Sequence, residues 1–251
     1  MYSQINVASK INNYEIKFQD NLELTENQIK IIDENVANNF PNLIDKNTLV
    51  VKCDEYLKSL NGIDKILNWL INIKANISSD IAVFGGGVLQ DAVGFCASIF
   101  CRGINYTLYP TTLLSQIDSC VGGKTSINYG DRKNILGTFY PPKKIIVSTK
   151  FLESLPHHDY CSGLGELFKF DILRNQLNKC LIPNLLIDKS KILDVIYDSL
   201  NYKISILHID EFDKKERKYL NFGHTFGHAL EITSNYQLSH GYAVVLGCLI
   251  A

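Results

Sequence analysis

The sequence lacks the features of secreted and membrane-spanning proteins. It has no Cys-x-x-Cys pair, and its cysteines are odd in number, seven in all. Such a set does not suit a disulfide framework, so we expect reduced thiols, as in a cytoplasm. The first residues do not form a basic and then apolar signal peptide, and no apolar run is long enough to span a membrane. These absences predict a soluble, cytoplasmic protein.

An excess of charge of one sign is also absent. The chain has 25 Lys and Arg residues against 26 Asp and Glu residues, a formal net charge of −1. This balance gives no indication of a nucleic-acid or anionic-membrane partner. The composition is that of an ordinary globular protein, 46% hydrophobic and 20% charged over 251 residues. This length fits one large domain or two small ones and can bury a substantial core.

Short apolar segments alternate with helix-length segments in the first part of the chain. The strand candidates are 29–32, 48–51, 80–84, 106–109 and 144–148, and the helix candidates between them are 34–40, 55–73, 88–101 and 111–120. This order predicts a parallel sheet covered by helices. Beyond about residue 154 helical periodicity dominates, over 158–173, 190–210, 214–234 and 240–251. We therefore expect an α/β domain over 1–155 and an all-α domain over 156–251.

One short stretch, 118–134, is unusually dense in glycine, lysine and amide residues. It contains Asp118, Gly122, Gly123, Lys124, Asn128, Lys133 and Asn134. Glycines let backbone N–H groups approach a ligand, and lysines bring charge to a phosphate. A plain turn with solvated lysines would give the same pattern. The stretch alone therefore leaves both anion binding and a turn open.

A second glycine-rich turn follows the third predicted strand and opens a helix. The residues Gly85-Gly86-Gly87 would let a pyrophosphate sit against the helix N-terminus, where free N–H groups and the helix dipole favour negative charge. A tight turn explains the glycines nearly as well, because the G-x-G-x-x-G fingerprint is absent. Asp33 and Asn35 end an earlier strand, where such side chains can hold ribose hydroxyls. Helix capping is the simpler interpretation of these two residues.

The second half carries a sharper signal, Asn221-Phe-Gly-His224-Thr-Phe-Gly-His228. Histidines four residues apart project from one face of a helix and can meet one ion or one substrate. The zinc-protease pattern is excluded, because it requires Glu directly after the first histidine. Glu166 lies in an apolar stretch, where an unpaired carboxylate is costly, and His240 opens the next helix candidate. Glu166, His224 and His240 would leave a coordination position open, as in catalytic zinc sites; satisfied core or capping groups are the alternative.

The motifs occur together and in a recognisable order. They are Gly-Gly-Gly-Val-x-x-Asp91, Arg102-Gly, Pro110-Thr-Thr-Leu-Leu, Asp118-Ser-x-Val-Gly-Gly-Lys124, Lys133-Asn134, Glu166-x-x-Lys169 and Asn221-Phe-Gly-His-Thr-Phe-Gly-His228. This set resembles the 3-dehydroquinate synthase family and, more broadly, the sugar phosphate cyclases, from about residue 29 to the last residue. The resemblance implies a Rossmann-like, parallel-sheet lobe that binds NAD, followed by an all-α lobe that binds a metal and the substrate.

The resemblance also implies roles for individual residues. The residues implied to bind NAD are Asp33, Asn35, Glu55, Lys58, Gly86, Gly87, Asp91, Thr111, Thr112, Lys133 and Ser154. The implied ligands of one divalent metal ion, Zn or Co, are Glu166, His224 and His240. The residues implied to contact the substrate and to act in catalysis are Arg102, Asp118, Lys124, Asn134, Lys169, Lys203, Arg217, Asn221 and His228. Lys133 also matches a substrate position. The family's counterpart of Arg102 reaches across a dimer interface, so we expect a homodimer.

The implied activity is that of a carbon–oxygen lyase of the shikimate pathway, in aromatic amino acid biosynthesis. The family converts 3-deoxy-D-arabino-heptulosonate 7-phosphate to 3-dehydroquinate and phosphate, by transient oxidation with NAD, phosphate elimination and aldol closure. Alternatives are a cyclase for another sugar phosphate, of the deoxy-scyllo-inosose or epi-valiolone synthase type, a related metal-dependent polyol dehydrogenase, and an inactive NAD-binding paralogue. Lysines suited to a phosphate argue against the dehydrogenase.

Three departures from the family pattern stand out. Tyr242 replaces a glutamate that neighbours a metal ligand, and loss of a supporting residue there can cost about 10–100-fold in metal affinity or activity. Asp213 stands where glutamate is common, and the sequence ends within an apolar, helix-like run, 243–251. Family members continue beyond this point, so the all-α domain is expected to be incomplete.

Overall fold

The computed structural model describes residues 4–22, 24–25, 28–177, 182–235 and 237–251. Two compact units account for the chain. The first consists of 1–111 and 119–151, and the second of 112–118 and 152–251. The short segment 112–118 thus belongs to the second unit, although its neighbours on both sides belong to the first. No helix among the described residues is long and apolar enough to cross a membrane.

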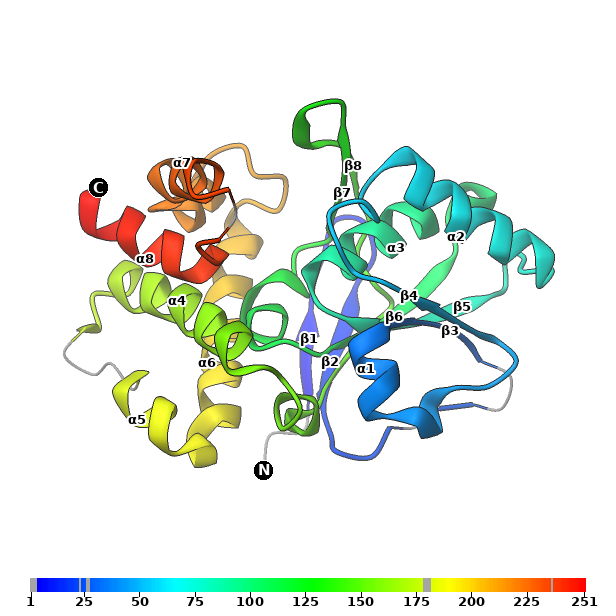
Figure 1. The fold of residues 1–251 in the computed structure, drawn as a ribbon, viewed down its shortest axis with the longest axis horizontal. Helices are drawn as coiled ribbons and strands as arrows, with labels where there is room; N and C mark the ends of the chain where they lie inside the picture. Colours follow the sequence, from blue (N-terminus) through cyan, green and yellow to red (C-terminus); the bar gives the residue numbers. More distant parts are fainter. Residues whose placement is uncertain (1–3, 23, 26–27, 178–181, 236) are drawn as a thin grey trace. The chain divides into compact units, whose positions relative to one another are not determined.

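A seven-stranded sheet forms the centre of the first unit, in the order β1-β2-β9-β6-β5-β3-β4 (Figure 1). Its strands are β1 (Gln4–Val7), β2 (Tyr14–Phe18), β3 (Ile29–Asp33), β4 (Thr48–Val51), β5 (Asp80–Gly85), β6 (Asn105–Pro110) and β9 (Lys144–Val147). All neighbouring pairs are parallel except β1 and β2. The predicted parallel sheet is therefore confirmed. The antiparallel β1–β2 pair at its edge was absent from the prediction.

Helices cover both faces of this sheet (Figure 1). They are α1 (Glu34–Asn39), α2 (Leu60–Asn72) and α3 (Gly87–Ile99). The chain moves from β3 outward to β4, then returns past β3 to β5 and on to β6. Because right-handed crossovers are nearly universal, this reversal places α1 on one face and α2 with α3 on the other. The reversal also creates a topological switch point between the carboxyl ends of β3 and β5, where open α/β sheets bind ligands.

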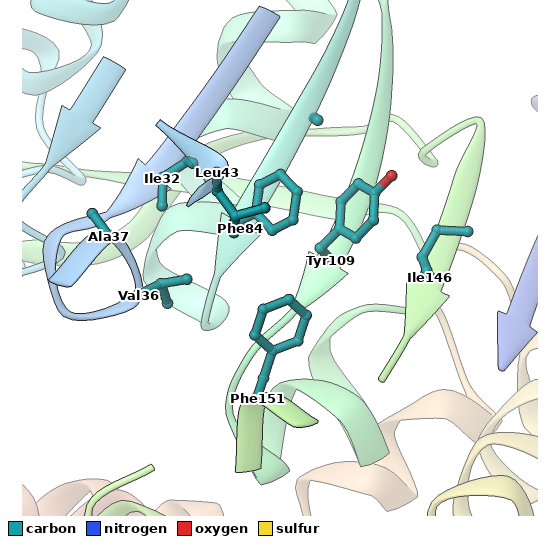
Figure 2. Packing of buried hydrophobic residues seen from close by; sticks show 9 residues of the cluster. Ile32, Val36, Ala37, Leu43, Phe84, Tyr109, Ile146 and Phe151 are labelled. Carbon is teal, nitrogen blue, oxygen red and sulfur yellow. The ribbon is translucent and has the colours of Figure 1, made fainter. Parts of the chain in front are cut away.

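The core around α1 is made of aliphatic and aromatic side chains from the sheet, from α1 itself and from two 3-10 turns (Figure 2). The rings of Phe84 and Tyr109 stack with their centroids 4.2 Å apart, and Phe151 meets Phe84 edge-on at 6.2 Å. Phe84 follows a fully apolar run in β5, as expected of a strand covered on both faces. Ile32 of β3 is paired in register with Phe84 and belongs to the same core. This packing fixes the ends of β3 and β5 relative to each other.

The stretch 118–134 contains more regular structure than a glycine-rich turn. Its second half forms a two-stranded antiparallel hairpin with the following residues, β7 (Lys124–Tyr129) and β8 (Arg132–Phe139). The helix expected over 111–120 is short, and its clearest part is a π-helical turn, η3 (Ser115–Ser119). Helix 55–73 begins later than expected, at Leu60, because Ser59 accepts a hydrogen bond from Gly62 N and caps the helix there.

The second unit is built of helices, in agreement with the all-α prediction. They are α4 (His157–Leu173), α5 (Ile182–Ile187), α6 (Ile192–Ile209), α7 (His224–Thr233) and α8 (His240–Ile250), with 3-10 turns η6 (Lys189–Lys191) and η7 (Glu216–Asn221). The single helix expected over 214–234 is wrong. Gly223 takes a left-handed conformation with φ 78°, which ends η7 and lets α7 start anew at His224.

Candidate functional site

Glu166, His224 and His240 come together in the second unit from three different helices. Glu166 lies within α4, and each histidine is the first residue of its helix, α7 or α8. One Glu166 oxygen, Oε1, is 3.5 Å from Nε2 of His224 and 3.2 Å from Nε2 of His240. One potential ligand atom from each residue lies within 4.8 Å of the others. The predicted trio therefore forms one cluster, with both Nε2 atoms directed toward the same carboxylate oxygen.

In both histidines, the second ring nitrogen, Nδ1, faces a hydrogen-bond acceptor. His224 Nδ1 is 3.3 Å from the carbonyl oxygen of Phe222. His240 Nδ1 is 3.4 Å from each carboxylate oxygen of Glu231. An acceptor at Nδ1 favours the tautomer that carries its hydrogen there, which leaves Nε2 as the lone-pair donor to a metal ion. The two rings are thus oriented alike by two unrelated acceptors.

The charges around the trio are strongly coupled. Burial disfavours the charged form of Glu166, but Lys169 and the nearby histidines outweigh it, and the pKa of Glu166 is lowered. Burial also opposes a charge on His240, yet hydrogen bonds and charges from Glu166 and Glu231 raise the pKa of His240 to about 9. His224 has its pKa lowered, chiefly by burial. Without an ion, the neighbouring carboxylates thus favour the charged form of His240, whereas burial favours the neutral form of His224.

The cluster meets the requirements of a divalent-ion site. Glu166 is only 1% exposed, and its Oε1 faces the Nε2 atoms of His240 and His224 at 3.2 and 3.5 Å. A buried carboxylate oxygen costs free energy unless a cation or proton satisfies it, and a metal ion bound by the two nitrogens would do so. One oxygen and two nitrogen ligands form the three-ligand set of catalytic zinc sites. The residues present therefore fit a metal ion.

Glycines next to the ligands allow the three helices to approach closely. A Cβ at Gly165 would lie 2.2 Å from the carbonyl oxygen of Gly241, and one at Gly241 would lie 1.8 Å from that of Ser162. These positions adjoin Glu166 and His240, respectively. Gly241 N also donates a hydrogen bond to Ser162 Oγ at 3.0 Å. Close backbone contact between α4 and α8 thus sets the distance between two of the three potential ligands.

A second group of charges, Asp118, Lys169 and Lys203, adjoins the trio. Lys203 Nζ lies 2.7 Å from Asp118 Oδ1 and donates to the Asp118 carbonyl oxygen at 2.6 Å. Lys169 is ion-paired with Glu166 and lies 3.9 Å from Asp118 Oδ2. Burial would raise the pKa of Asp118, but the two lysines outweigh it and hold that pKa well below its usual range. Lys169 has a raised pKa, since these carboxylates outweigh its burial.

The other predicted residues of the second unit differ in exposure. Arg217 is 4% exposed, and its guanidinium donates to the carbonyl oxygen of Glu211. Asn221 is exposed at the end of η7. His228 is 59% exposed, and its ring centroid is 5.3 Å from that of His224. The predicted helix face therefore carries one half-buried and one largely exposed histidine.

In the first unit, three of the residues predicted for the nucleotide, Asp33, Gly86 and Gly87, lie at the carboxyl ends of the strands at the switch point. Asp33 ends β3, and Gly86 and Gly87 open α3 directly after β5. The N-terminus of α3 has no capping side chain, and a helix N-terminus of this kind can accept an anionic group of a ligand. Asp33 accepts a hydrogen bond from Asn35 N at 2.8 Å and caps α1. The capping interpretation of Asp33 is therefore confirmed, with Asn35 exposed beside it.

A polar cluster joins the hairpin β7–β8 to the rest of the first unit. Lys58 Nζ is buried and lies 2.6 Å from both Asp91 Oδ2 and Asn134 Oδ1. Ser126 donates to the same two oxygens, at 3.2 and 3.0 Å. Asn134 has a left-handed backbone, φ 54°, which only few non-glycine residues adopt. Lys58 thus connects residues predicted for the nucleotide with one predicted for the substrate.

The remaining predicted residues lie outside this cluster, and two of them, Thr112 and Ser154, belong to the second unit. Glu55 is 3.5 Å from Lys133 and accepts a hydrogen bond from Asn128 at 2.7 Å. Lys124, Lys133, Ser154 and Arg102 are exposed, whereas Thr111 is buried and Thr112 is bonded to Ser115. Arg102 has φ 66° and sits between Cys101 and Gly103, whose φ angles are also positive. Three successive positive φ values make this turn unusual.

Tyr242 does not occupy a position beside the trio. It lines an apolar groove of about 220 Å³ in the second unit, together with Cys161, Leu164 and Phe168. A hydrogen bond to Cys161 raises the pKa of Tyr242. Glu231 is the carboxylate at Nδ1 of His240, and sequence reasoning missed it. Its spacing of three residues after His228 in His-Ala-Leu-Glu places those two residues on one helix face, but this spacing does not reveal the contact with His240.

The fold is shared with solved sugar phosphate cyclases. A 2-deoxy-scyllo-inosose synthase superposes with a TM-score of 0.82 and 23% identity, covering 98% of this chain and 75% of the other. The 2-epi-5-epi-valiolone synthase of Streptomyces hygroscopicus gives 0.80 and 24%, covering 96% and 74%. At this identity the likeness establishes the fold and no more.

The sequence identifies the family to which the chain belongs. Family models described as the N-terminal and C-terminal parts of 3-dehydroquinate synthase match residues 48–162 and 163–251. A 3-dehydroquinate synthase of Campylobacter concisus is 34% identical over 264 residues, covering 100% of this chain and 76% of that protein. The chain belongs to the 3-dehydroquinate synthase family.

Other relatives in the family are longer than this chain. The 3-dehydroquinate synthase of Dictyoglomus turgidum is 42% identical over 213 residues, covering 82% of this chain and 60% of that protein. The Clostridium tetani enzyme of the same name is 38% identical, with 95% and 65% covered. The chain therefore spans about three fifths to two thirds of these two relatives.

Proposed function

We propose that this chain supplies the nucleotide and metal sites of a 3-dehydroquinate synthase. The reaction is the conversion of 3-deoxy-D-arabino-heptulosonate 7-phosphate to 3-dehydroquinate with release of phosphate, a carbon–oxygen lyase reaction of the shikimate pathway. The observation that carries the proposal is the convergence of His224 and His240 on the buried Oε1 of Glu166. In a chain of this family, that convergence matches a catalytic metal position.

The cofactors of the proposed reaction are NAD and one divalent ion, Zn²⁺ or Co²⁺. The 2-deoxy-scyllo-inosose synthase structure contains NAD⁺ and Co²⁺, and the valiolone synthase structure contains NAD⁺ and Zn²⁺. Bound NAD⁺ would supply a hydride acceptor for a ring hydroxyl and would be regenerated, so no net NADH would form. The ion would supply a Lewis acid. Glu166, His224 and His240 would hold the ion, and the switch point at Asp33, Gly86 and Gly87 would hold the nucleotide.

The charged residues beside the trio would position the substrate and control its protons. Lys169 and Lys203 are buried cations held by Asp118 and Glu166, and their ammonium groups are suited to hydrogen-bond hydroxyl and ketone oxygens. Oxidation of one hydroxyl acidifies the neighbouring C–H, and loss of that proton expels phosphate from the adjacent carbon. The departing phosphate dianion is itself a base that can take up this proton. Ring opening and an intramolecular aldol step then close the carbocycle.

The substrate's two anionic groups call for separate partners. We assign the phosphate to Lys124, Asn134, Arg102 and His228, because lysine, arginine and histidine side chains suit phosphate oxygens. Arg217 is assigned to the substrate carboxylate, since a guanidinium can bind a carboxylate with two parallel hydrogen bonds. Arg102 would act from the partner subunit of a homodimer, and its exposure and unusual turn are in keeping with a contact outside its own subunit.

A second candidate is cyclisation of another sugar phosphate, of the deoxy-scyllo-inosose or epi-valiolone synthase type. The observation in its favour is the burial of Arg217, whose guanidinium already contacts the carbonyl of Glu211. A guanidinium engaged in this way offers fewer donors to a carboxylate than an open one.

Phosphate release tests the proposal. The purified protein is incubated with the heptulosonate phosphate, NAD⁺ and Co²⁺, and phosphate and NADH are followed together. We expect phosphate release without net accumulation of NADH. Steady NADH production would indicate a dehydrogenase, and phosphate release only from a sugar phosphate without a carboxylate, such as glucose 6-phosphate, would favour the second candidate. No release by a folded, Co²⁺-loaded protein would contradict both and favour an inactive paralogue.

A further inference from the structure

Glu231 contacts the metal trio without belonging to it. It lies in α7, two turns after His224, and its side chain is only 15% exposed. Both of its carboxylate oxygens are 3.4 Å from His240 Nδ1. Glu166 lies 3.2 Å from the opposite nitrogen of the same ring. The His240 ring is therefore held between two carboxylates, one at each nitrogen.

Two interpretations of Glu231 can be separated by geometry. Glu231 could be a ligand in a second ion site with His228 and His240, because one ligand atom from each lies within 4.8 Å of the others. His228, however, is 59% exposed and its Nε2 is 4.0 Å from Glu231. A shared ion would also need the Nδ1 atom of His240 that already faces both Glu231 oxygens. The shorter and two-pronged contact favours Glu231 as an acceptor for His240.

The need for such an acceptor follows from the position of His240. His240 is the first residue of α8, and its side chain is 32% exposed, twice the 16% of His224. His224 is oriented by the backbone carbonyl of Phe222, which no side-chain substitution can remove. The ring of His240 depends on a side chain from another helix. An unheld, partly exposed imidazole would sample other rotamers and lose affinity for an ion.

We propose that Glu231 is the positioning residue for His240: its carboxylate accepts the Nδ1 hydrogen and fixes the ring with Nε2 directed at the ion held by Glu166 and His224. This inference rests on the proposed metal site. It also relocates the supporting carboxylate, since Tyr242, the residue that follows His240 directly, lies in the apolar groove beside Cys161 instead. In this chain the support comes from α7, one turn of helix beyond His228.

Co²⁺ affinity measures this role without reference to turnover. The parent protein and the Glu231→Ala, Glu231→Gln and Glu153→Ala variants are titrated with Co²⁺ against a competing chelator, with circular dichroism as the check on folding. We expect Glu231→Ala to weaken binding about 10–100-fold, the usual cost of removing a residue that orients a metal ligand. Glu231→Gln keeps an acceptor oxygen and should lose less than about tenfold. Glu153→Ala removes an exposed carboxylate of the same unit and should change nothing.

A proton resonance provides a second readout. In the Zn²⁺-loaded parent protein, the Nδ1–H proton of His240 should be slow to exchange and its resonance shifted downfield. In Glu231→Ala this resonance should be lost, while that of His224 remains.

Unchanged Co²⁺ affinity in Glu231→Ala would overturn the inference. So would two Co²⁺ ions per parent chain with one lost in the variant, or a loss in Glu231→Gln as large as that in Glu231→Ala. Should Glu231→Ala not fold, the Glu231→Gln affinity and the parent resonance decide. A parent protein that binds no Co²⁺ would instead overturn the proposed metal site, and this inference with it.

Discussion

Some residues in this chain have structural roles that the sequence motifs do not reveal. Asp33 was predicted both as a ribose contact and as a helix cap, and the structure shows the cap. The two uses are compatible, because an N-cap at the end of β3 also stands at the switch point of the sheet. The nucleotide contact itself stays a prediction.

Lys58 offers a direct test at this scale. Its side chain is 7% exposed and holds Asp91, which is 27% exposed, so Lys58→Met would leave a mostly buried carboxylate without its cation. We expect a loss of about 3 kcal/mol in the free energy of unfolding, the low end of the range for breaking a buried pair. Urea unfolding of the metal-free protein measures it.

Lys30 provides the matched control for that substitution. Its side chain is also 7% exposed, but its partner Asp45 is 42% exposed and can be hydrated instead. Lys30→Met should therefore cost no more than about 1 kcal/mol. Equal losses in the two variants would show that Asp91 does not depend on Lys58.

Asp118 predicts a pH dependence of stability. Its pKa is lowered in the folded protein, because the charges of Lys203 and Lys169 outweigh its burial. A lowered folded pKa contributes stability that is present above the unfolded value, about 4, and is lost as the pH falls below it. The parent protein should lose stability more steeply between about pH 5 and 2 than Asp118→Asn. Urea unfolding at several pH values measures this, and identical slopes would contradict it.

Sequence reasoning was strongest for residues within ordered motifs and weakest for isolated contacts. Glu166, His224 and His240 were each identifiable by residue type and spacing, and the structure places them together. Glu231 was missed because its partner His240 lies on another helix, and no spacing along one helix reveals that contact. The exposure of His228 and the burial of Arg217 likewise depend on tertiary packing.

At the scale of elements, the predictable parts were those with strong periodicity. The five strands predicted for the parallel sheet all occur. The inner strands β3, β5 and β6 are mostly buried, as expected of apolar runs covered on both faces, whereas the edge strand β4 is only partly buried. The hairpin β7–β8 was missed, since its exposed second strand has no apolar alternation to mark it. The break at Gly223 was missed because His224 to His228 continues the helical spacing on its far side. Glycine there signals a left-handed cap only once the backbone is known.

The contact between α4 and α8 makes a prediction at this scale. A methyl group in Gly241→Ala would lie 1.8 Å from the carbonyl oxygen of Ser162, so the two helices would have to separate. We expect a loss of about 1–3 kcal/mol in stability, the usual cost of overpacking, together with weaker Co²⁺ binding. Thermal unfolding and Co²⁺ titration measure the two effects.

Gly87→Ala is the control for that variant. The nearest atom to its added methyl group is Ser119 Oγ at 3.4 Å, an ordinary contact. Stability should change by no more than about 0.5 kcal/mol. Co²⁺ affinity unaltered in Gly241→Ala would show that the spacing of α4 and α8 does not set the metal site.

For the whole molecule, the proposed homodimer predicts complementation between inactive variants. If Arg102 acts in the partner's site, Arg102→Ala and His224→Ala proteins should each be inactive alone. Mixed and allowed to exchange subunits, they should recover about a quarter of the parental activity, because half of the dimers are mixed and each then has one intact site. Sedimentation establishes the dimer, and the absence of recovery despite subunit exchange would place Arg102 within its own subunit's site.

The central claim is that Glu166, His224 and His240 hold a single divalent ion. The most direct test is the metal content of the parent protein and of His224→Ala after Co²⁺ loading and gel filtration. The account predicts about one Co²⁺ per parent chain, as for a mononuclear catalytic site. We expect almost no bound Co²⁺ in His224→Ala. The NAD⁺ affinity of this variant should equal that of the parent protein. A full equivalent of Co²⁺ retained by His224→Ala would contradict the claim.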